Sequence, residues 1–142
     1  MDIEKLCQVG EGKTLEYKRN TDSLESILKS VIAFANTIGG IILIGVEDDG
    51  TIVGVNNPGK IQEQVANSIA NRVKPQLLPD ISVATIGDKS VLVVQIEHVP
   101  SPHYLSDKGI EKSVYIRIGN SNHLASHETI EELKRRRIDF LY

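Results

Sequence analysis

Acidic residues at two places in the sequence could hold a divalent metal ion. Glu11 and Glu16 are close together, and an acidic run at residues 47–49 follows a long apolar stretch. Mg²⁺ and Mn²⁺ prefer carboxylate oxygens, and such an ion can polarise a phosphodiester and activate water for in-line attack. Lys18 shares a predicted strand face with Glu16, where it could bind a phosphate beside the metal. The competing interpretation is that Glu11 is a solvated loop residue and that the acidic run forms a turn.

Two stretches resemble part of a phosphate-binding P-loop. In GEGKT, residues 10–14, Cys7 occupies the position of the first glycine, and a strand-like alternation follows where a P-loop would open a helix. GVNNPGK, residues 54–60, matches Gly-x-x-x-x-Gly-Lys between a strand and a helix. However, Ile61 replaces the hydroxyl residue that holds Mg²⁺, and Pro58 lacks an N–H donor. Because GVNNPGK still matches the glycine and lysine positions, ATP binding is kept as an alternative function despite these two departures.

The composition is that of a soluble globular protein in a reducing compartment. The chain has 142 residues, of which 40% are hydrophobic and 25% are charged, and its net charge is −3. Cys7 is the only cysteine, which excludes an intramolecular disulfide and a cysteine-based zinc cluster. The apolar run IILIGV is too short to span a bilayer and no signal pattern is present, so we expect a cytoplasmic protein without membrane contact. The negative charge requires any nucleic-acid site to be a local basic patch.

Hydrophobic periodicity predicts a mixed sheet with packed helices, the α+β class. Residues 14–18 alternate, which predicts a strand with Leu15 and Tyr17 on one face and polar side chains on the other. A capping box at residues 22–25 opens a helix with an apolar stripe, and glycines 39 and 40 end it. IILIGV, residues 41–46, predicts a central strand that is apolar on both faces. A hairpin turn at Asp49-Gly50 then leads into TIVGV, residues 51–55, as the next strand.

The second half of the sequence predicts one helix, three strands and a last helix. Asn57 and Pro58 begin a helix that runs through residue 73, and Ser126 caps the last helix, residues 126–137. The strands between them are DISVATI, SVLVVQI and SVYIRI. The predicted order is β-α-β-β-α-β-β-β-α in a single domain over residues 1–142, the N-terminal part of a longer protein. The apolar end IDFLY, with Ile138, Phe140 and Leu141, is a candidate contact surface or the start of a following domain.

The sequence resembles the AlbA_2 domain, also called the Schlafen AlbA_2 domain. The motifs that carry the resemblance occur in order and cover a core of about residues 9–133: EGKTLEYKR, AFANTIGGIILIGVEDDGTIVGV, PHY, YIRIGNSN and ASHETIEEL. The resemblance implies a nucleic-acid-binding domain. In bacteria and archaea such domains usually form the N-terminus of longer predicted transcriptional regulators, often labelled DNA-binding or RecG-like helicase.

The resemblance to animal Schlafens implies a cradle for tRNA-like RNA that some members cleave with three carboxylates. Glu11 and Glu16 match the first two, and Asp48, with Glu47 as its rival, matches the third. A Mg- or Mn-dependent RNA endonuclease with Glu11, Glu16 and Asp48 as catalytic residues and metal ligands is thus an alternative. Three uncompensated carboxylates would repel one another, so Glu16→Gln would leave the metal-free protein as stable or more stable. Schlafens also carry a cysteine zinc site, which this chain cannot build, and two tandem domain copies, so a cradle here implies a homodimer.

Basic residues near the predicted acids could neutralise phosphates. In YIRI, Tyr115 and Arg117 share a strand face on which they could stack a base and hold a phosphate, although an ordinary wet sheet face is the competing interpretation. We expect a DNA- or RNA-binding domain of a transcriptional regulator, with a protein-interaction or dimerisation module as a further alternative. The candidate nucleic-acid-binding residues are Lys13, Lys18, Arg19, Arg72, Lys74, Tyr115 and Arg117.

Overall fold

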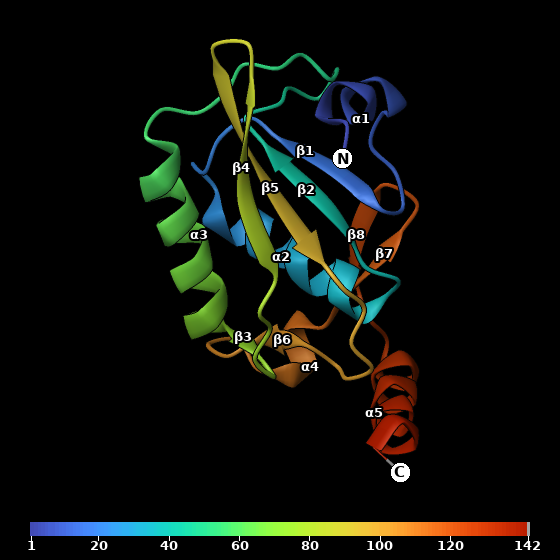
Figure 1. The fold of residues 1–142 in the computed structure, drawn as a ribbon. Coiled ribbons are helices and arrows are strands. Elements are labelled where there is room, and N and C mark those ends of the chain that lie inside the picture. Colours follow the sequence, from blue (N-terminus) through green and yellow to red (C-terminus); the bar gives the residue numbers. More distant parts are fainter. Residues whose placement is uncertain (142) are drawn as a thin grey trace.

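A four-stranded mixed sheet lies at the centre of the protein (Figure 1). The computed structural model describes residues 1–141, with side chains as far as Ile138. The sheet has the strand order β1-β2-β5-β4, in which only β1 and β2 are parallel. This arrangement confirms the predicted α+β class. The four strands are β1 (Leu15–Lys18), β2 (Gly40–Ile44), β4 (Asp80–Ile86) and β5 (Lys89–Ile96).

The sheet separates two hydrophobic clusters, because its central strands are apolar on both faces. Ile42 and Ile44 of β2 belong to a cluster with helices α2 (Leu24–Asn36) and α3 (Pro58–Arg72). Leu43 belongs to the other cluster, which contains residues of helix α1 (Ile3–Val9). Alternate side chains of β5 divide between the two clusters in the same way. The prediction of a central strand buried on both faces is therefore confirmed.

The remaining elements are short, apart from the last helix, which extends away from the sheet in Figure 1. The first helix, α1, and most of the two- to four-residue elements were not predicted, because they are too short to show a hydrophobic period. The strand at residues 115–118 and the last helix match the predicted strand SVYIRI and the predicted last helix. No described helix is both long and apolar enough to cross a membrane. The elements outside the central sheet and helices α1 to α3 are β3 (Val73–Lys74), β6 (Tyr104–Leu105), α4 (Ile110–Ser113), β7 (Tyr115–Ile118), β8 (Ser121–Leu124) and α5 (His127–Leu141).

Residues 51–55 do not form the predicted strand. Their only ladder contact is an isolated bridge between Val46 and Ile52. The N–H groups of residues 53 and 54 both donate to the Gly45 carbonyl, at 2.9 and 2.8 Å, instead of alternating along a neighbouring strand. The segment therefore crosses the end of the sheet as a loop. At the other end of the chain, Ile138 is 57% exposed, while the side chains of Phe140 and Leu141 lie outside the described residues.

Helix α2 is buried on nearly all sides, and its last residue, Asn36, connects it to two distant segments. The Asn36 side chain is 2% exposed. Its Nδ2 donates to the carbonyls of His103 and Tyr115 at 3.0 and 2.9 Å, and its Oδ1 accepts from the His103 N–H at 2.8 Å. Buried polar groups of this kind lose stability when one partner is removed. Asn36 therefore holds β7 and the segment before β6 against the end of α2.

Replacing the Asn36 amide with a carboxyl tests that role. Asn36→Asp keeps the size but turns the donor to two carbonyls into an acceptor. Burial should raise the pKa of the introduced carboxyl in the folded state above its ordinary value of about 3.9. The variant should therefore lose stability as the pH rises and this buried carboxyl ionises. We expect the unfolding free energy in urea to fall by about 2–4 kcal/mol at pH 7 and by less at pH 4. An equal loss at both pH values would contradict this role.

Candidate functional site

Arg117 of β7 is buried against the loop before β1, and all five of its guanidinium N–H donors face oxygen atoms. The residue is 2% exposed. Its Nε and Nη2 donate to the Gly12 carbonyl at 3.2 and 3.0 Å, and Nη2 also reaches the Leu15 carbonyl at 3.3 Å. Its Nη1 donates to Glu16 Oε1 at 2.7 Å and to Asn122 Oδ1 at 2.9 Å. A buried charge needs this degree of pairing to be tolerated.

Glu16 of β1 is the counter-charge of Arg117, and other donors hold its second oxygen. Glu16 is 6% exposed. Its Oε2 accepts a short hydrogen bond from Ser30 Oγ and lies 3.5 Å from Lys18 Nζ. Asn122 Nδ2 donates to Ser30 Oγ at 2.9 Å, which closes a ring of polar side chains. This buried network of Glu16, Ser30, Arg117 and Asn122 joins β1, α2, β7 and β8.

Arg117 and the loop before β1 also close the outer edge of the sheet at β1. The Leu15 carbonyl accepts from the Gly12 N–H at 2.9 Å and from Arg117. The Tyr17 N–H donates to Glu11 Oε2 at 3.3 Å. These are the backbone groups of β1 that point away from β2, because β2 pairs with the carbonyls of residues 14 and 18. The edge strand is therefore capped by its own preceding loop and by the guanidinium.

Glu11 lies half-buried beside this network and is influenced by the other predicted acids. Burial raises the pKa of the Glu11 carboxyl above its ordinary value, and the hydrogen bond from Tyr17 opposes the rise. The negative charges of Glu16 and Asp48 raise this pKa further, and Arg117 lowers it. Asp48 itself is exposed in the turn after β2. Glu16 and Asp48 therefore both lie within electrostatic range of Glu11.

In this arrangement the three acids do not fit a divalent ion. Both Glu16 oxygens already face donors, and Arg117 supplies the positive charge that a metal would provide there. Within residues 1–141, as far as side chains are described, no three Asp, Glu, His or Cys side chains are placed to hold a metal together. Metal binding and catalysis by Glu11, Glu16 and Asp48 stay predictions that this geometry does not favour.

The prediction that Tyr115 and Arg117 of YIRI lie on a solvent-exposed face is wrong. Tyr115 is 9% exposed and Arg117 is 2% exposed, whereas Ile118 is 56% exposed. The side chains turn inward because α2 covers this face: the Arg117 guanidinium lies 4.8 Å from the ring centroid of Phe34, and the Lys29 ammonium lies 5.4 Å from that of Tyr115. In this structure neither Tyr115 nor Arg117 is placed to stack a base or contact a phosphate.

The other predicted basic residues lie at separate places. Lys13, before β1, and Lys74, after α3, are exposed. The Arg19 side chain is 68% exposed and pairs with Glu47 at 2.9 Å. Lys18 is mostly buried and contacts the network through Glu16. Arg72 is held by Glu25 at 3.0 Å and Asp107 at 3.1 Å. The structure therefore leaves Lys13, Arg19 and Lys74 as the most accessible cations of the predicted set.

Neither P-loop-like stretch leads directly from a strand into a helix, as a P-loop does. Residues 10–14 connect α1 to β1, so no helix follows them. Asn57 before α3 has a left-handed φ of 52° and makes no capping hydrogen bond through its side chain. The residues before it, 53–56, line an open hollow of about 370 Å³ together with residues 19–22. Binding of ATP stays a prediction.

The sequence patterns did not indicate Ser30 and Asn122, although both complete the buried network. Ser30 lies 14 positions from Glu16 in the sequence, and Asn122 lies 92 positions from Ser30, so no local spacing connects them. A serine in the middle of the apolar stretch of α2 is the one signal that could have indicated a buried polar partner.

Comparison with known proteins gives a family for this fold. The family model described as Schlafen, AlbA_2 matches residues 11–126, a range that contains the whole buried network. The solution NMR structure of the N-terminal domain of an ATP-dependent DNA helicase RecG-related protein from Nitrosomonas europaea is similar, with a TM-score of 0.67 and 30% identity. That match covers 89% of this chain and 96% of the other.

The crystal structure of the DIP2311 protein from Corynebacterium diphtheriae has the same fold, with a TM-score of 0.67 at 18% identity. The match covers 87% of this chain but only 24% of the Corynebacterium chain. This chain therefore spans about a quarter of that protein.

Removing one partner of the buried ion pair tests the structural role of Glu16. Glu16→Gln keeps the shape but leaves the Arg117 guanidinium buried without its counter-charge. We expect the unfolding free energy in urea at pH 7 to fall by about 3–5 kcal/mol, the reverse of the gain expected for uncompensated carboxylates. Glu47→Gln breaks the exposed pair with Arg19 and should lower it by less than about 1 kcal/mol. Equal effects would show that the buried network contributes no more than a surface pair.

The titration of Glu11 tests the proximity of the acids. In a ¹³C NMR titration the Glu11 carboxyl should have its midpoint above about 4.3, and Asp48→Asn should lower that midpoint by removing a negative charge. The control Asp88→Asn, in the β4–β5 turn, should leave it unchanged. A raised pKa in the folded state means that the wild type loses stability as the pH rises and Glu11 ionises. Glu11→Gln has no carboxyl to ionise, so its stability relative to the wild type should increase from pH 4 to pH 7. A Glu11 midpoint at or below the ordinary value would overturn this assignment.

Proposed function

This chain belongs to the Schlafen AlbA_2 family, and from that membership we propose that it is a nucleic-acid-binding domain that contacts phosphates through exposed cations. The observation that carries the proposal is the family match over residues 11–126. It is supported by the 30% identity to a domain of a protein named as DNA helicase RecG-related. Because the buried acids serve the fold, the proposal places binding on the surface.

The exposed cations support contact with several phosphates. Lys13 and Arg19 flank the two ends of β1, six positions apart, a separation that is at most about 20 Å even for a fully extended chain. Cations this far apart would contact different phosphates of one strand, whose spacing along a duplex is about 3.4 Å. Contacts of this kind position a nucleic acid without reading its bases. We therefore expect binding with little sequence preference and a strong dependence on salt.

Further functions are proposed on the resemblance alone. We propose that the domain is one module of a longer transcriptional regulator whose other parts supply sequence specificity. The homodimeric cradle, the protein-interaction module and the RNA endonuclease stay predictions. Of these, the endonuclease is the one that the pairing of Glu16 with Arg117 disfavours.

Charge reversal of the exposed cations tests the proposal. The triple variant Lys13→Glu, Arg19→Glu, Lys74→Glu should bind fluorescein-labelled tRNA and double-stranded DNA at least tenfold more weakly in anisotropy titrations. The slope of log K against log salt should also become shallower by about 0.7–0.9 for each lost phosphate contact.

A matched control separates contacts made by these three cations from an effect of the net charge. Lys60→Glu, Lys89→Glu, Lys112→Glu reverses three exposed lysines on other elements and changes the total charge by the same amount. We expect this control to keep at least a third of the wild-type affinity. Equal loss in both triple variants would show that these three cations are not the phosphate contacts. Absence of salt-dependent binding of either nucleic acid by the wild type would contradict the proposed function.

A further inference from the structure

The outer edge of β4 carries free backbone groups. Residues 86 and 89 flank the two-residue turn at Gly87-Asp88 and form a hydrogen-bonded pair. Counting back from residue 86, the N–H and C=O groups of every second residue of β4 also point toward β5. The N–H and C=O groups of Ile81, Val83 and Thr85 therefore point away from β5. Gln62 of α3 donates to the Ile81 carbonyl at 2.6 Å, which agrees with this assignment. Within the described chain, no hydrogen bond is found for the outward groups of Val83 and Thr85.

The two edges of the sheet thus differ in whether their outward backbone groups are hydrogen-bonded. The β1 edge is capped by Glu11, Gly12 and Arg117. The strand at the other edge, β4, has a proline only just before it, Pro79, and a charge only at its first residue, Asp80. Residues 81–86 contain neither, although such residues normally protect exposed edges. Val83 is also an exposed apolar side chain, at 38%. An edge with these properties is a template for another strand.

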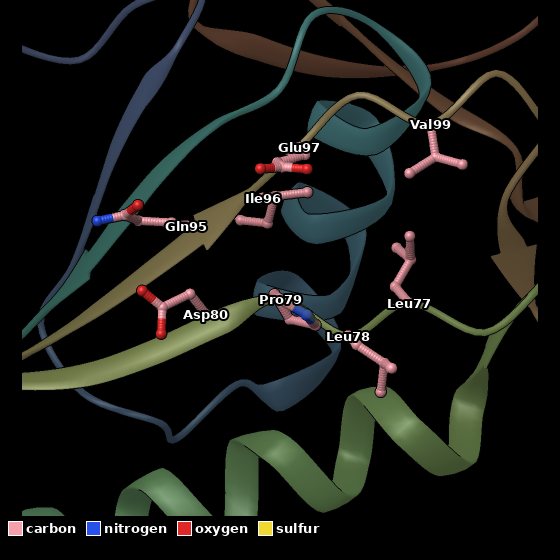
Figure 2. A pocket seen from close by; sticks show the side chains of 8 residues that line it. All are labelled: Leu77, Leu78, Pro79, Asp80, Gln95, Ile96, Glu97 and Val99. Carbon is pink, nitrogen blue, oxygen red and sulfur yellow. The ribbon is translucent and has the colours of Figure 1, made fainter.

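A hollow at the beginning of β4 has an apolar side and an acidic side. Figure 2 shows the carboxyl groups of Asp80 and Glu97 on one side and the side chains of Leu77, Leu78 and Val99 on the other. The hollow measures about 240 Å³, and Leu78 is 85% exposed. Its shape and charge suit a lysine or arginine side chain, whose stem is apolar and whose head is positive.

A second hollow lies along the other half of the strand, between β4 and α1. It measures about 520 Å³ and also combines apolar side chains with two acids. In the part of the chain with described side chains, none of the four acids in the two hollows forms a salt bridge. The second hollow is lined by Met1, Asp2, Ile3, Glu4, Ala84, Thr85 and Ile86.

We propose that the free edge of β4 binds an extended segment of a partner protein, with alternating apolar and basic side chains. Backbone pairing to Val83 and Thr85 supplies affinity, and the two acid-lined hollows select the side chains. The charges favour a basic partner over a second copy of this chain. If two copies paired antiparallel through residues 83 and 85, Asp80 of each would lie opposite Asp88 of the other, where like charges repel.

An NMR titration with a synthetic peptide tests this surface. The probe is the acetylated, amidated peptide KVRVTVK, and the control is EVEVTVE, which has the same pattern but opposite charge. We expect KVRVTVK to shift the Val83 and Thr85 amides with a Kd at least tenfold lower than that of the control. It should also slow the hydrogen exchange of these two amides at least tenfold, because no hydrogen bond within the described chain protects them in the unbound protein.

Two variants separate edge pairing from side-chain selection. Val83→Pro removes an outward N–H without breaking the β4–β5 ladder and should abolish binding while leaving tRNA affinity unchanged. Asp80→Asn with Glu97→Gln keeps the edge and should weaken binding at least tenfold. Equal binding of both peptides, binding unchanged in either variant, or shifts produced by tRNA at these amides would overturn the proposal. Protection of these amides that increases with protein concentration alone would assign the edge to a second copy instead.

Discussion

The burial of one positive charge constrains the rest of this structure. Arg117 can remain inside only if all its donors are satisfied, and this requirement fixes the carbonyls of Gly12 and Leu15, the carboxylate of Glu16 and the amide of Asn122 around it. The β7–β8 hairpin is thereby locked to the loop before β1. One edge of the sheet is capped as a result, and β4 is left as the edge with free backbone groups.

The same constraint decides what the acidic residues do. Acids that could hold a metal are here divided between a buried ion pair, a strand cap and an exposed turn, at Glu16, Glu11 and Asp48. A guanidinium already neutralises Glu16, so the proposed nucleic-acid binding does not require a metal at this point. Both proposed functions therefore lie at the surface, where accessible cations and the acid-lined edge of β4 present opposite charges that suit different partners.

The sequence predicted the elements whose hydrophobic pattern is regular, and it could not predict long-range polar pairing. The central strand, the β4–β5 hairpin and the long helices follow from apolar periodicity and turn residues. In YIRI the alternation was recognised, but its polar face was predicted to face solvent. That face lies inward because Arg117 pairs with Glu16, which is 101 positions away in the sequence. Glu16 and Asp48 were predicted to be near Glu11 by resemblance, but spacing alone could not show that Arg117 would replace a metal.

The most direct test of the structural role of these acids is the melting temperature with and without Mn²⁺. An ion bound by the folded protein raises stability by mass action, by about 2.7 kcal/mol at a concentration of 100 times Kd. Because the Glu16 oxygens are occupied by protein donors, we expect millimolar Mn²⁺ to change the melting temperature of the wild type by less than about 1 °C. A rise of several degrees that disappears in Asp48→Asn, whose exposed carboxylate lies outside the buried network, would contradict this role and restore the metal site.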